Sequence, residues 1–230
     1  MRAEPPMWAQ AVGSRLGQAT HAHISRFAEP PADARPAAVL VLLRDRGAGA
    51  ETVVVTRSQA LRTHAGQVAF PGGAVEPHDE GPVAAAVREA AEETSVDPAS
   101  LHMLAVWPTL WIPVSGFAVT PVFAWCQDDS DITGRGDDTE VVSAHALRLD
   151  TAAAPAVRRL AVYPNGATGP AFDVDGLFIW GFTGLVLDRV LHLTGWEQPW
   201  QPAEVVELPT TTKAPPESLG PVDVEAGGVR

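Results

Sequence analysis

Residues 72–96 read GGAVEPHDEGPVAAAVREAAEETSV, and this stretch joins a glycine turn to a helix that carries a cluster of glutamates. Glu89, Glu92 and Glu93 are spaced at i, i+3 and i+4, which places them on one side of a helix. Like charges at these spacings destabilise an isolated helix by about 0.2–0.5 kcal/mol per pair. A solvated helix face gains nothing from such crowding, whereas a hard cation such as Mg2+ takes carboxylate oxygens as ligands. The cluster therefore predicts a metal site.

The helix is predicted over about residues 81–95. Asp79 can act as its N-cap or as an acid in its first turn, and Pro82 suits a position where no N–H is needed. One apolar stripe is expected to face a core, formed by Val83, Val87, Ala90, Ala91 and Thr94. The glutamates would then face the turn at residues 70–73, where glycines let the backbone approach a ligand.

The same stretch resembles the Nudix box, whose usual form is G-x5-E-x7-R-E-U-x-E-E-x-G-U with U aliphatic. Its R-E-U-x-E-E core is matched by residues 88–93, Arg-Glu-Ala-Ala-Glu-Glu. The first acidic position holds Asp79 in place of Glu, with Glu80 as the alternative occupant, and Arg88 comes one residue late. Ser95 stands where the pattern has its last glycine, and Val96 closes the motif.

The preceding residues 53–73, VVVTRSQALRTHAGQVAFPGG, are similar to a segment of the coenzyme A pyrophosphatase branch of Nudix hydrolases. That branch carries L-L-T-x-R-S-x3-R-x3-G-x3-F-P-G-G before its box. Eight residues fall in register, namely Arg57, Ser58, Arg62, Gly66, Phe70, Pro71, Gly72 and Gly73, while Val55 replaces the Thr. The branch also tends to have an extra residue in the box, which accommodates the late arginine. The resemblance runs over roughly residues 35–195.

This resemblance implies an α/β/α sandwich with a mixed β-sheet and an enzyme dependent on Mg2+ or Mn2+. The reaction implied is hydrolysis of the pyrophosphate bond of coenzyme A or a derivative, giving 3′,5′-ADP and (acyl-)4′-phosphopantetheine. Glu89, Glu92 and Glu93 would be the metal ligands, and Arg88 would orient these carboxylates by ion pairing. The family also suggests a homodimer.

Other residues keep alternative interpretations. Arg57 and Arg62 are either surface residues of a loop or contacts to substrate phosphate, and their place in the upstream segment favours the second. Glu140 is either an ordinary strand start or a group from a loop distant from the box that acts as a further metal ligand or general base. The predicted catalytic set is Glu89, Glu92, Arg88 and Glu140, and the predicted substrate-binding set is Arg57, Arg62, Gly72 and Gly73.

Three functions remain open at this point. The first is the coenzyme A pyrophosphatase. The second is a Nudix enzyme for another nucleoside diphosphate derivative such as ADP-ribose, which the upstream segment disfavours. The third is a noncatalytic Nudix-like nucleotide-binding module, which the retained Arg-Glu and Glu-Glu pairs disfavour.

Bulk composition narrows the partners. The 230 residues carry a net charge of −12 with a pI near 4.9, which argues against nonspecific binding to nucleic acid or to an anionic membrane surface. An anionic substrate would therefore be attracted locally, by a metal or by single arginines. Cys126 is the only cysteine, so no intrachain disulfide can form. No signal-peptide core and no stretch near the ~18 apolar residues of a membrane span is seen, so a cytoplasmic protein is expected.

The chain divides into three predicted parts. Residues 1–34 hold a short helix over 6–17, with Trp8, Val12 and Leu16 at spacings of four, and a proline-rich connector. Residues 35–200 form the main domain, and residues 201–230, rich in Pro, Thr, Glu and Gly, are predicted to be a disordered tail. Within the domain we expect a hairpin of 37–43 with 52–56, strands at 102–107, 117–126 and 140–147, and helices at 151–160 and 178–194. Asp188 and Arg189 are expected on the wet face of the last helix, and a mixed sheet flanked by helices is the architecture that this order favours.

Overall fold

The computed structural model of this 230-residue chain describes residues 4–25, 29–47, 49–58, 66–127, 141–201 and 204–208. At its centre is an eight-stranded mixed sheet built on β1 (Arg35–Asp45). β1 is apolar and buried along most of its length, which is typical of a strand covered on both faces. It pairs in parallel with β7 (Phe117–Trp125) and antiparallel with β2 (Ala50–Arg57) and β4 (Gly72–Ala74).

Four further strands complete this main sheet: β3 (Val68–Ala69), β5 (His102–Val106), β6 (Leu110–Ile112) and β8 (Val141–Arg148). β3 and β8 pair with β2, while β5 and β6 pair with β7. The predicted hairpin is the β1–β2 pair, and the three predicted strands are β5, β7 and β8, so these expectations are confirmed.

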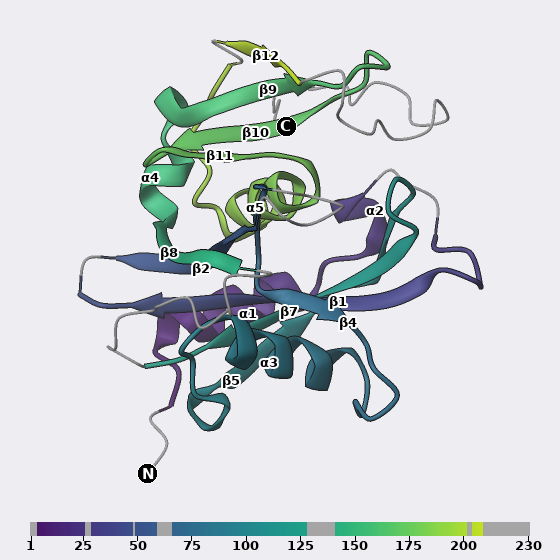
Figure 1. The fold of residues 1–230 in the computed structure, drawn as a ribbon. Helices are drawn as coiled ribbons and strands as arrows, with labels where there is room; N and C mark the ends of the chain where they lie inside the picture. The colour runs from purple at the N-terminus through teal and green to yellow at the C-terminus, as the bar shows by residue number, and fades with distance from the viewer. Residues whose placement is uncertain are drawn as a thin grey trace.

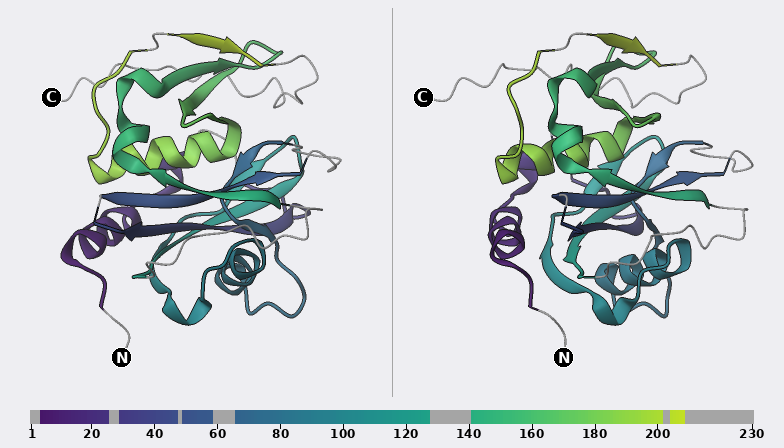
Figure 2. Two further views of the ribbon diagram at one scale, coloured as in Figure 1. Left: turned by 60° about the vertical axis from the view of Figure 1, so that its left-hand side comes forward. Right: turned by 90° about the vertical axis from the view of Figure 1, so that its left-hand side faces the viewer.

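Helices cover both faces of the main sheet (Figures 1 and 2). α3 (Pro82–Glu93) packs on one face against β1 and β4. α5 (Gly181–Thr194) lies over the other face, and it ends at Gly195, whose φ of 76° suits a glycine at the end of a helix. The predicted α/β/α sandwich around a mixed sheet is therefore confirmed. None of the helices in the described ranges has the length and apolar character that crossing a membrane requires.

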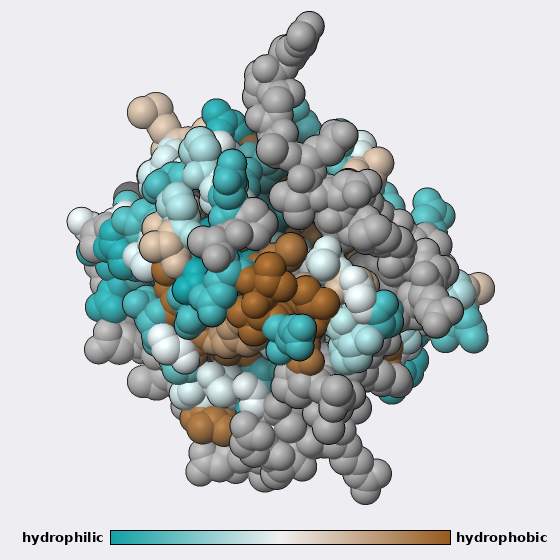
Figure 3. Space-filling model, turned by 90° about the horizontal axis from the view of Figure 1, so that it is seen from above, coloured by the Kyte–Doolittle hydropathy of each residue, from teal (hydrophilic) through white to brown (hydrophobic). Residues whose placement is uncertain are grey.

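A second sheet lies on the far side of α5, so that this helix is held between two sheets (Figure 1). Its order is β11-β10-β9-β12, with bounds Leu177–Ile179, Thr168–Val174, Arg158–Val162 and Val205–Glu207. A small apolar cluster belongs to this sheet and is separate from the main core, formed by Ala161, Ala171 and Leu208 with Tyr163, Phe178 and Trp180 packed against them. Seen from the side of this sheet, apolar side chains gather near the centre of the surface (Figure 3).

This second sheet corrects three sequence predictions. The expected helix at 151–160 is α4 (Leu149–Ala153) and a 3-10 turn (Pro155–Val157), after which the chain enters β9. The expected helix at 178–194 begins only at Gly181, because residues 177–179 form β11. The predicted disordered tail is wrong for residues 205–207, since β12 pairs in parallel with β9 and Leu208 beyond it is buried. Residues 209–230 lie outside the described ranges.

The N-terminal segment shares the core of the main sheet. α1 (Met7–Gly17) confirms the predicted helix, and Val12 and Leu16 are buried in the main core together with Ile24 of the short α2 (His21–Ile24). The indole of Trp107 donates a hydrogen bond to the carbonyl of Leu16 at 3.0 Å. The residues before the predicted boundary at residue 34 therefore share one hydrophobic core with the main domain.

Candidate active site

The helix that carries the glutamates begins as the sequence predicts but buries a slightly different stripe. Pro82 occupies its first turn, while the N-cap is Gly81 with a φ of 118°, so Asp79 is neither the cap nor an acid of the first turn, and that prediction is wrong. The fully buried helix positions are Ala85, Ala86, Ala90 and Glu93, with Val83 and Val87 packed at the edges. The small alanines let the helix lie close to β1. As a result, one of the three glutamates, Glu93, points into the protein.

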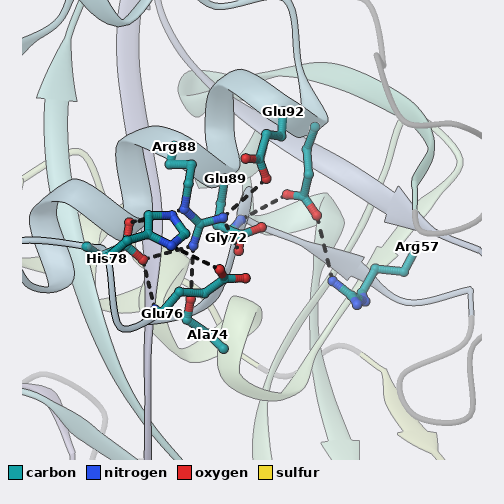
Figure 4. Close-up of polar contacts among 10 residues, drawn as sticks. Arg57, Gly72, Ala74, Glu76, His78, Arg88, Glu89 and Glu92 are labelled. Atoms are coloured by element: carbon teal, nitrogen blue, oxygen red, sulfur yellow. Dashed lines mark hydrogen bonds and ion pairs between the residues drawn. The ribbon is translucent and has the colours of Figure 1, made fainter.

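The buried glutamate is held by the glycine turn. The backbone N–H of Gly72 donates a hydrogen bond of 2.9 Å to Oε2 of Glu93 (Figure 4). Only 6% of the Glu93 side chain is exposed, compared with 14% for Glu89 and 59% for Glu92. The three glutamates thus range from nearly buried to well solvated, although they share one side of the helix.

Gly73 gives the Glu89 carboxylate its place. A Cβ atom added to Gly73 would lie only 2.7 Å from Oε2 of Glu89 and closer still to its other carboxylate atoms. A Cβ on Gly72 would in turn collide with the backbone of Ala38 and Val39 on β1. Gly72 is therefore required for the close approach of β4 to β1, and Gly73 leaves the space that the Glu89 carboxylate occupies; the predicted approach of this backbone to a ligand stays a prediction.

Arg88 ties this group together. Its Nε and Nη2 donate to the two carboxylate oxygens of Asp79 at 3.1 and 3.0 Å, which is the forked pairing typical of arginine with carboxylate. Nη1 donates to Glu89 at 2.9 Å and to Glu92 at 3.2 Å, and Nη2 also reaches the carbonyl of Ala74 at 3.2 Å. Of the two candidates for the first acidic position of the box, Asp79 binds Arg88, whereas Glu80 is exposed.

The fork fixes the charge of both partners. The hydrogen bond from Arg88, followed by one from the backbone N–H of Glu76, lowers the pKa of Asp79 to about 2. The hydrogen bond to Asp79 likewise raises the pKa of the Arg88 guanidinium further above its usual range. Both groups are charged at neutral pH, so the loop from Gly73 to Gly81 is closed by a stable ion pair.

Arg57 reaches the same group from β2, and Figure 4 shows it well apart from Arg88. Its Nη1 lies 3.9 Å from Oε1 of Glu93. Its buried Nε finds no hydrogen-bond partner in the part of the chain that the structure describes. The structure thus brings Arg57, Gly72, Gly73, Arg88 and the three glutamates together. Arg62 and Glu140, the other two predicted site residues, lie outside the described residues.

The chemistry of this set suits a hard divalent cation. Four carboxylates (Asp79, Glu89, Glu92 and Glu93) face two arginines, which leaves an excess of two negative charges next to bare glycine backbone. Oxygen ligands of this kind are those that Mg2+ takes in proteins. With the side chains as they stand, the described residues contain no three acidic, histidine or cysteine groups converging on a single point. These residues therefore suit a divalent cation by the type of their donor atoms and by their net charge.

Sequence reasoning overlooked two polar groups. The first group lies beside Arg57 and consists of Thr56, Ser143 and His145. The i, i+2 spacing of Ser143 and His145 could have indicated it, because this spacing places both side chains on one face of a strand. The second is the ion pair of Arg158 with Asp188, which shows that the predicted wet position of Asp188 is wrong: the residue is buried.

Parts of this chain are similar to known proteins. The family model described as the NUDIX domain matches residues 34–163, which include the main sheet, the glycine turn and α3. A protein named an uncharacterized Nudix hydrolase, NudL, from Citrobacter koseri is 35% identical over 166 residues, covering 69% of this chain and 83% of the relative. A NudL of Klebsiella aerogenes is 48% identical over 94 residues, covering 40% and 76%. Among solved structures, the Nudix hydrolase RenU of M. smegmatis is 21% identical, with a TM-score of 0.49 over 75% of this chain and 90% of that one.

Proposed function

The chain belongs to the Nudix family, and from that premise we propose that it hydrolyses the pyrophosphate bond of coenzyme A or one of its derivatives. As a Nudix hydrolase it is an enzyme of the pyrophosphatase type, and enzymes of this family generally use divalent metal ions. We propose in addition that the metal is Mg2+ or Mn2+.

One observation carries the proposal: the upstream segment and the box meet at a single side chain. Glu93 of the box accepts a hydrogen bond from Gly72 and lies 3.9 Å from Arg57, and both of these residues belong to the coenzyme A-like segment. A substrate phosphate held by that segment would therefore lie beside the carboxylates.

Glu89, Glu93 and Glu92 are the proposed ligands of the metal. When bound, the metal would neutralise the pyrophosphate charge and lower the pKa of water. Glu93 is the anchoring member, because Gly72 fixes one of its oxygens. Glu92 is the most solvated of the three, so it is the member best placed to exchange a proton with water.

The remaining roles follow from the contacts. Arg88 orients Glu89 and Glu92 by hydrogen bonds and is itself fixed by Asp79, so its role is to hold the carboxylates. Arg57, whose side chain is 25% exposed beside Glu93, is the proposed contact to a phosphate oxygen. Glu92 or Glu140 would accept the proton of the attacking water. Water adds to phosphorus, the bridging P–O bond breaks, and the products are 3′,5′-ADP and 4′-phosphopantetheine.

A substrate panel tests the proposal. Coenzyme A, acetyl-coenzyme A, dephospho-coenzyme A and ADP-ribose would be compared by kcat/KM with the purified protein in Mg2+ and in Mn2+. Coenzyme A or its acyl form is expected to be cleaved fastest. A preference for ADP-ribose would overturn the substrate assignment, and the absence of cleavage of every member would favour a binding module.

A second comparison tests the 3′-phosphate, which dephospho-coenzyme A lacks. A charge-assisted contact to phosphate contributes about 1.5–3 kcal/mol, so losing one lowers kcat/KM by roughly one to two decades. Arg62→Ala is expected to reduce hydrolysis of coenzyme A by that amount and to leave dephospho-coenzyme A much less affected. Equal losses on both substrates would assign Arg62 to the loop or to the pyrophosphate instead.

A further inference from the structure

A small polar cluster lies on the face of the main sheet opposite to α3, directly behind Arg57. Nε2 of His145 is 2.9 Å from Oγ1 of Thr56 and 2.9 Å from Oγ of Ser143. Thr56 comes from β2, while Ser143 and His145 come from β8. The imidazole therefore links two neighbouring strands through their side chains.

The pairing of these strands changes at the cluster. Thr56 lies opposite Ser143, but the next residue of β2, Arg57, lies opposite Val141, so Val142 is left over. Such a shift is a β-bulge, a feature that re-aims side chains and is common beside active sites. As a consequence Val141 is buried opposite Arg57, whereas Val142 is 56% exposed.

The direction of Arg57 follows from its place on β2. Successive side chains of a strand point to opposite faces, so Thr56 faces the cluster and Arg57 faces α3 and Glu93. On its other edge, Arg57 is held by backbone hydrogen bonds with Gln67 and Gly66, of 2.9 and 3.1 Å. On the β8 edge, the ladder is interrupted next to Arg57, and the last regular pair before the interruption is the one that His145 bridges.

We propose that His145 is a positioning residue: by bridging Thr56 and Ser143, it fixes the last regular β2–β8 pair before the bulge and so holds Arg57, the next residue of β2, toward the carboxylates of α3. This inference rests on the proposed function of Arg57 in the site. His145 touches neither the carboxylates nor the glycine turn in the described residues, so its effect on the reaction passes through Arg57.

A double-mutant cycle tests the link kinetically. His145→Ala is expected to lower kcat/KM roughly 10-fold, because a small misplacement of a positioning group costs one to two decades. In an Arg57→Ala background the same change is expected to have less than about a twofold effect, since coupled residues are not additive. His145→Gln, which retains a polar group at similar reach, is expected to recover much of the loss. Thr56→Val, which leaves the imidazole of His145 in place but removes one of its two hydroxyl partners, is expected to show a partial loss of kcat/KM.

The matched control is His192→Ala on α5, which removes another hydrogen-bonded histidine, 58% exposed, from a different part of the fold. It is expected to leave kcat/KM unchanged. Losses from His145→Ala that are equal in both backgrounds, or no loss in the wild-type background, would overturn the proposal. All assays run below the melting temperature of every variant.

A readout without substrate separates this inference from the proposed function. The side-chain Nε signal of Arg57, assigned by its disappearance in Arg57→Ala, is followed by NMR. It is expected to shift in His145→Ala and Thr56→Val and to stay in place in His192→Ala. An unmoved signal in both cluster variants would refute the positioning role even if the enzyme is active. A shifted signal in a protein that cleaves no member of the panel would retain the positioning role and reject the substrate assignment.

Discussion

Two arginines of this chain, Arg88 and Arg158, are each surrounded by carboxylates, but they differ in burial and in the balance of charge around them. The Arg88 cluster (Arg88 with Asp79, Glu89 and Glu92, and the adjacent pair of Glu93 with Arg57) lies at the edge of α3, with 20% of the Arg88 side chain exposed. The Arg158 cluster (Arg158 with Asp188, Glu197, Phe172 and Trp200) lies between α5 and the second sheet, with the arginine side chain fully buried.

The difference lies in charge balance and in covering. In the Arg158 cluster, Arg158 and the neighbouring Arg189 match Asp188 and Glu197, and the rings of Phe172 and Trp200 lie within 4.7 and 4.3 Å of the guanidinium. Around Arg88 the carboxylates outnumber the arginines and lie next to glycine backbone that carries no side chain. A buried cluster whose charges balance and whose arginine is covered by aromatic rings is typical of a structural role. Unbalanced charge beside open backbone indicates a ligand.

The largest expected effect is on stability, at the Arg158 cluster. Arg158→Met leaves buried Asp188 without its hydrogen-bonded partner and with only Arg189 at 3.8 Å, and breaking a buried pair costs about 3–5 kcal/mol. The free energy of unfolding from denaturant titration would measure it. Arg158→Met combined with Asp188→Leu is expected to recover most of the loss, because an apolar pair of similar volume removes the buried charge. A loss below about 1 kcal/mol for the single variant would show that this cluster is not structural.

At the Arg88 cluster the expected effect is on turnover. Glu93→Gln keeps the size of the side chain but removes its charge, and should lower kcat by ~10²-fold or more, as loss of a charge-stabilising group does. The melting temperature is expected to change little, because like charges on α3 then repel less. The matched control is Glu197→Gln in the Arg158 cluster, with kcat retained. If both variants lost kcat equally, the distinction between the two clusters would fail.

A smaller loss is expected when β12 is removed. Ending the chain after Ala203 removes this strand and the buried Leu208, and full burial of one leucine side chain contributes about 1.5–3 kcal/mol. Thermal unfolding should show a lower melting temperature than for a chain ended after Leu208, which keeps β12. Identical melting temperatures would mean that β12 adds nothing to the second sheet.

The smallest expected effect is the pH dependence of the Asp79–Arg88 pair. The folded-state pKa of Asp79 is lowered from 3.8 to about 2, so its contribution to stability is present above pH 4 and is lost as pH falls through 2. Wild type should therefore melt slightly above Asp79→Asn at pH 6, and the two curves should converge near pH 2. A difference that grows toward low pH would have the wrong sign.

The features that could be predicted from sequence are local. The helix and its glutamates are encoded within residues 72–96, and the glycine turn precedes them by a fixed number of residues. The upstream segment predicts Arg57 as a contact to phosphate, whereas its closeness to Glu93 is known only from the structure.

The features that could not be predicted depend on distant partners. β12 pairs with β9 across more than forty residues, and nothing in the Pro- and Thr-rich composition around it signals a strand. Asp188 looks like a solvated helix position because its partner, Arg158, comes from another element thirty residues away. The same holds for His145, whose partner Thr56 lies on a strand 89 residues earlier. The periodicity of a sequence indicates which residues share one face of a helix or strand, but it does not indicate which other element packs on that face.

Binding of Mn2+ to the purified protein, followed by electron paramagnetic resonance, would test whether the Arg88 cluster is a metal site. We expect wild type and Glu197→Gln to bind Mn2+ with the same affinity, and Glu93→Gln to bind at least ~10-fold more weakly, as loss of groups in or around a metal site does. Unchanged Mn2+ binding by Glu93→Gln, or no binding by wild type, would contradict the assignment of these carboxylates to a metal.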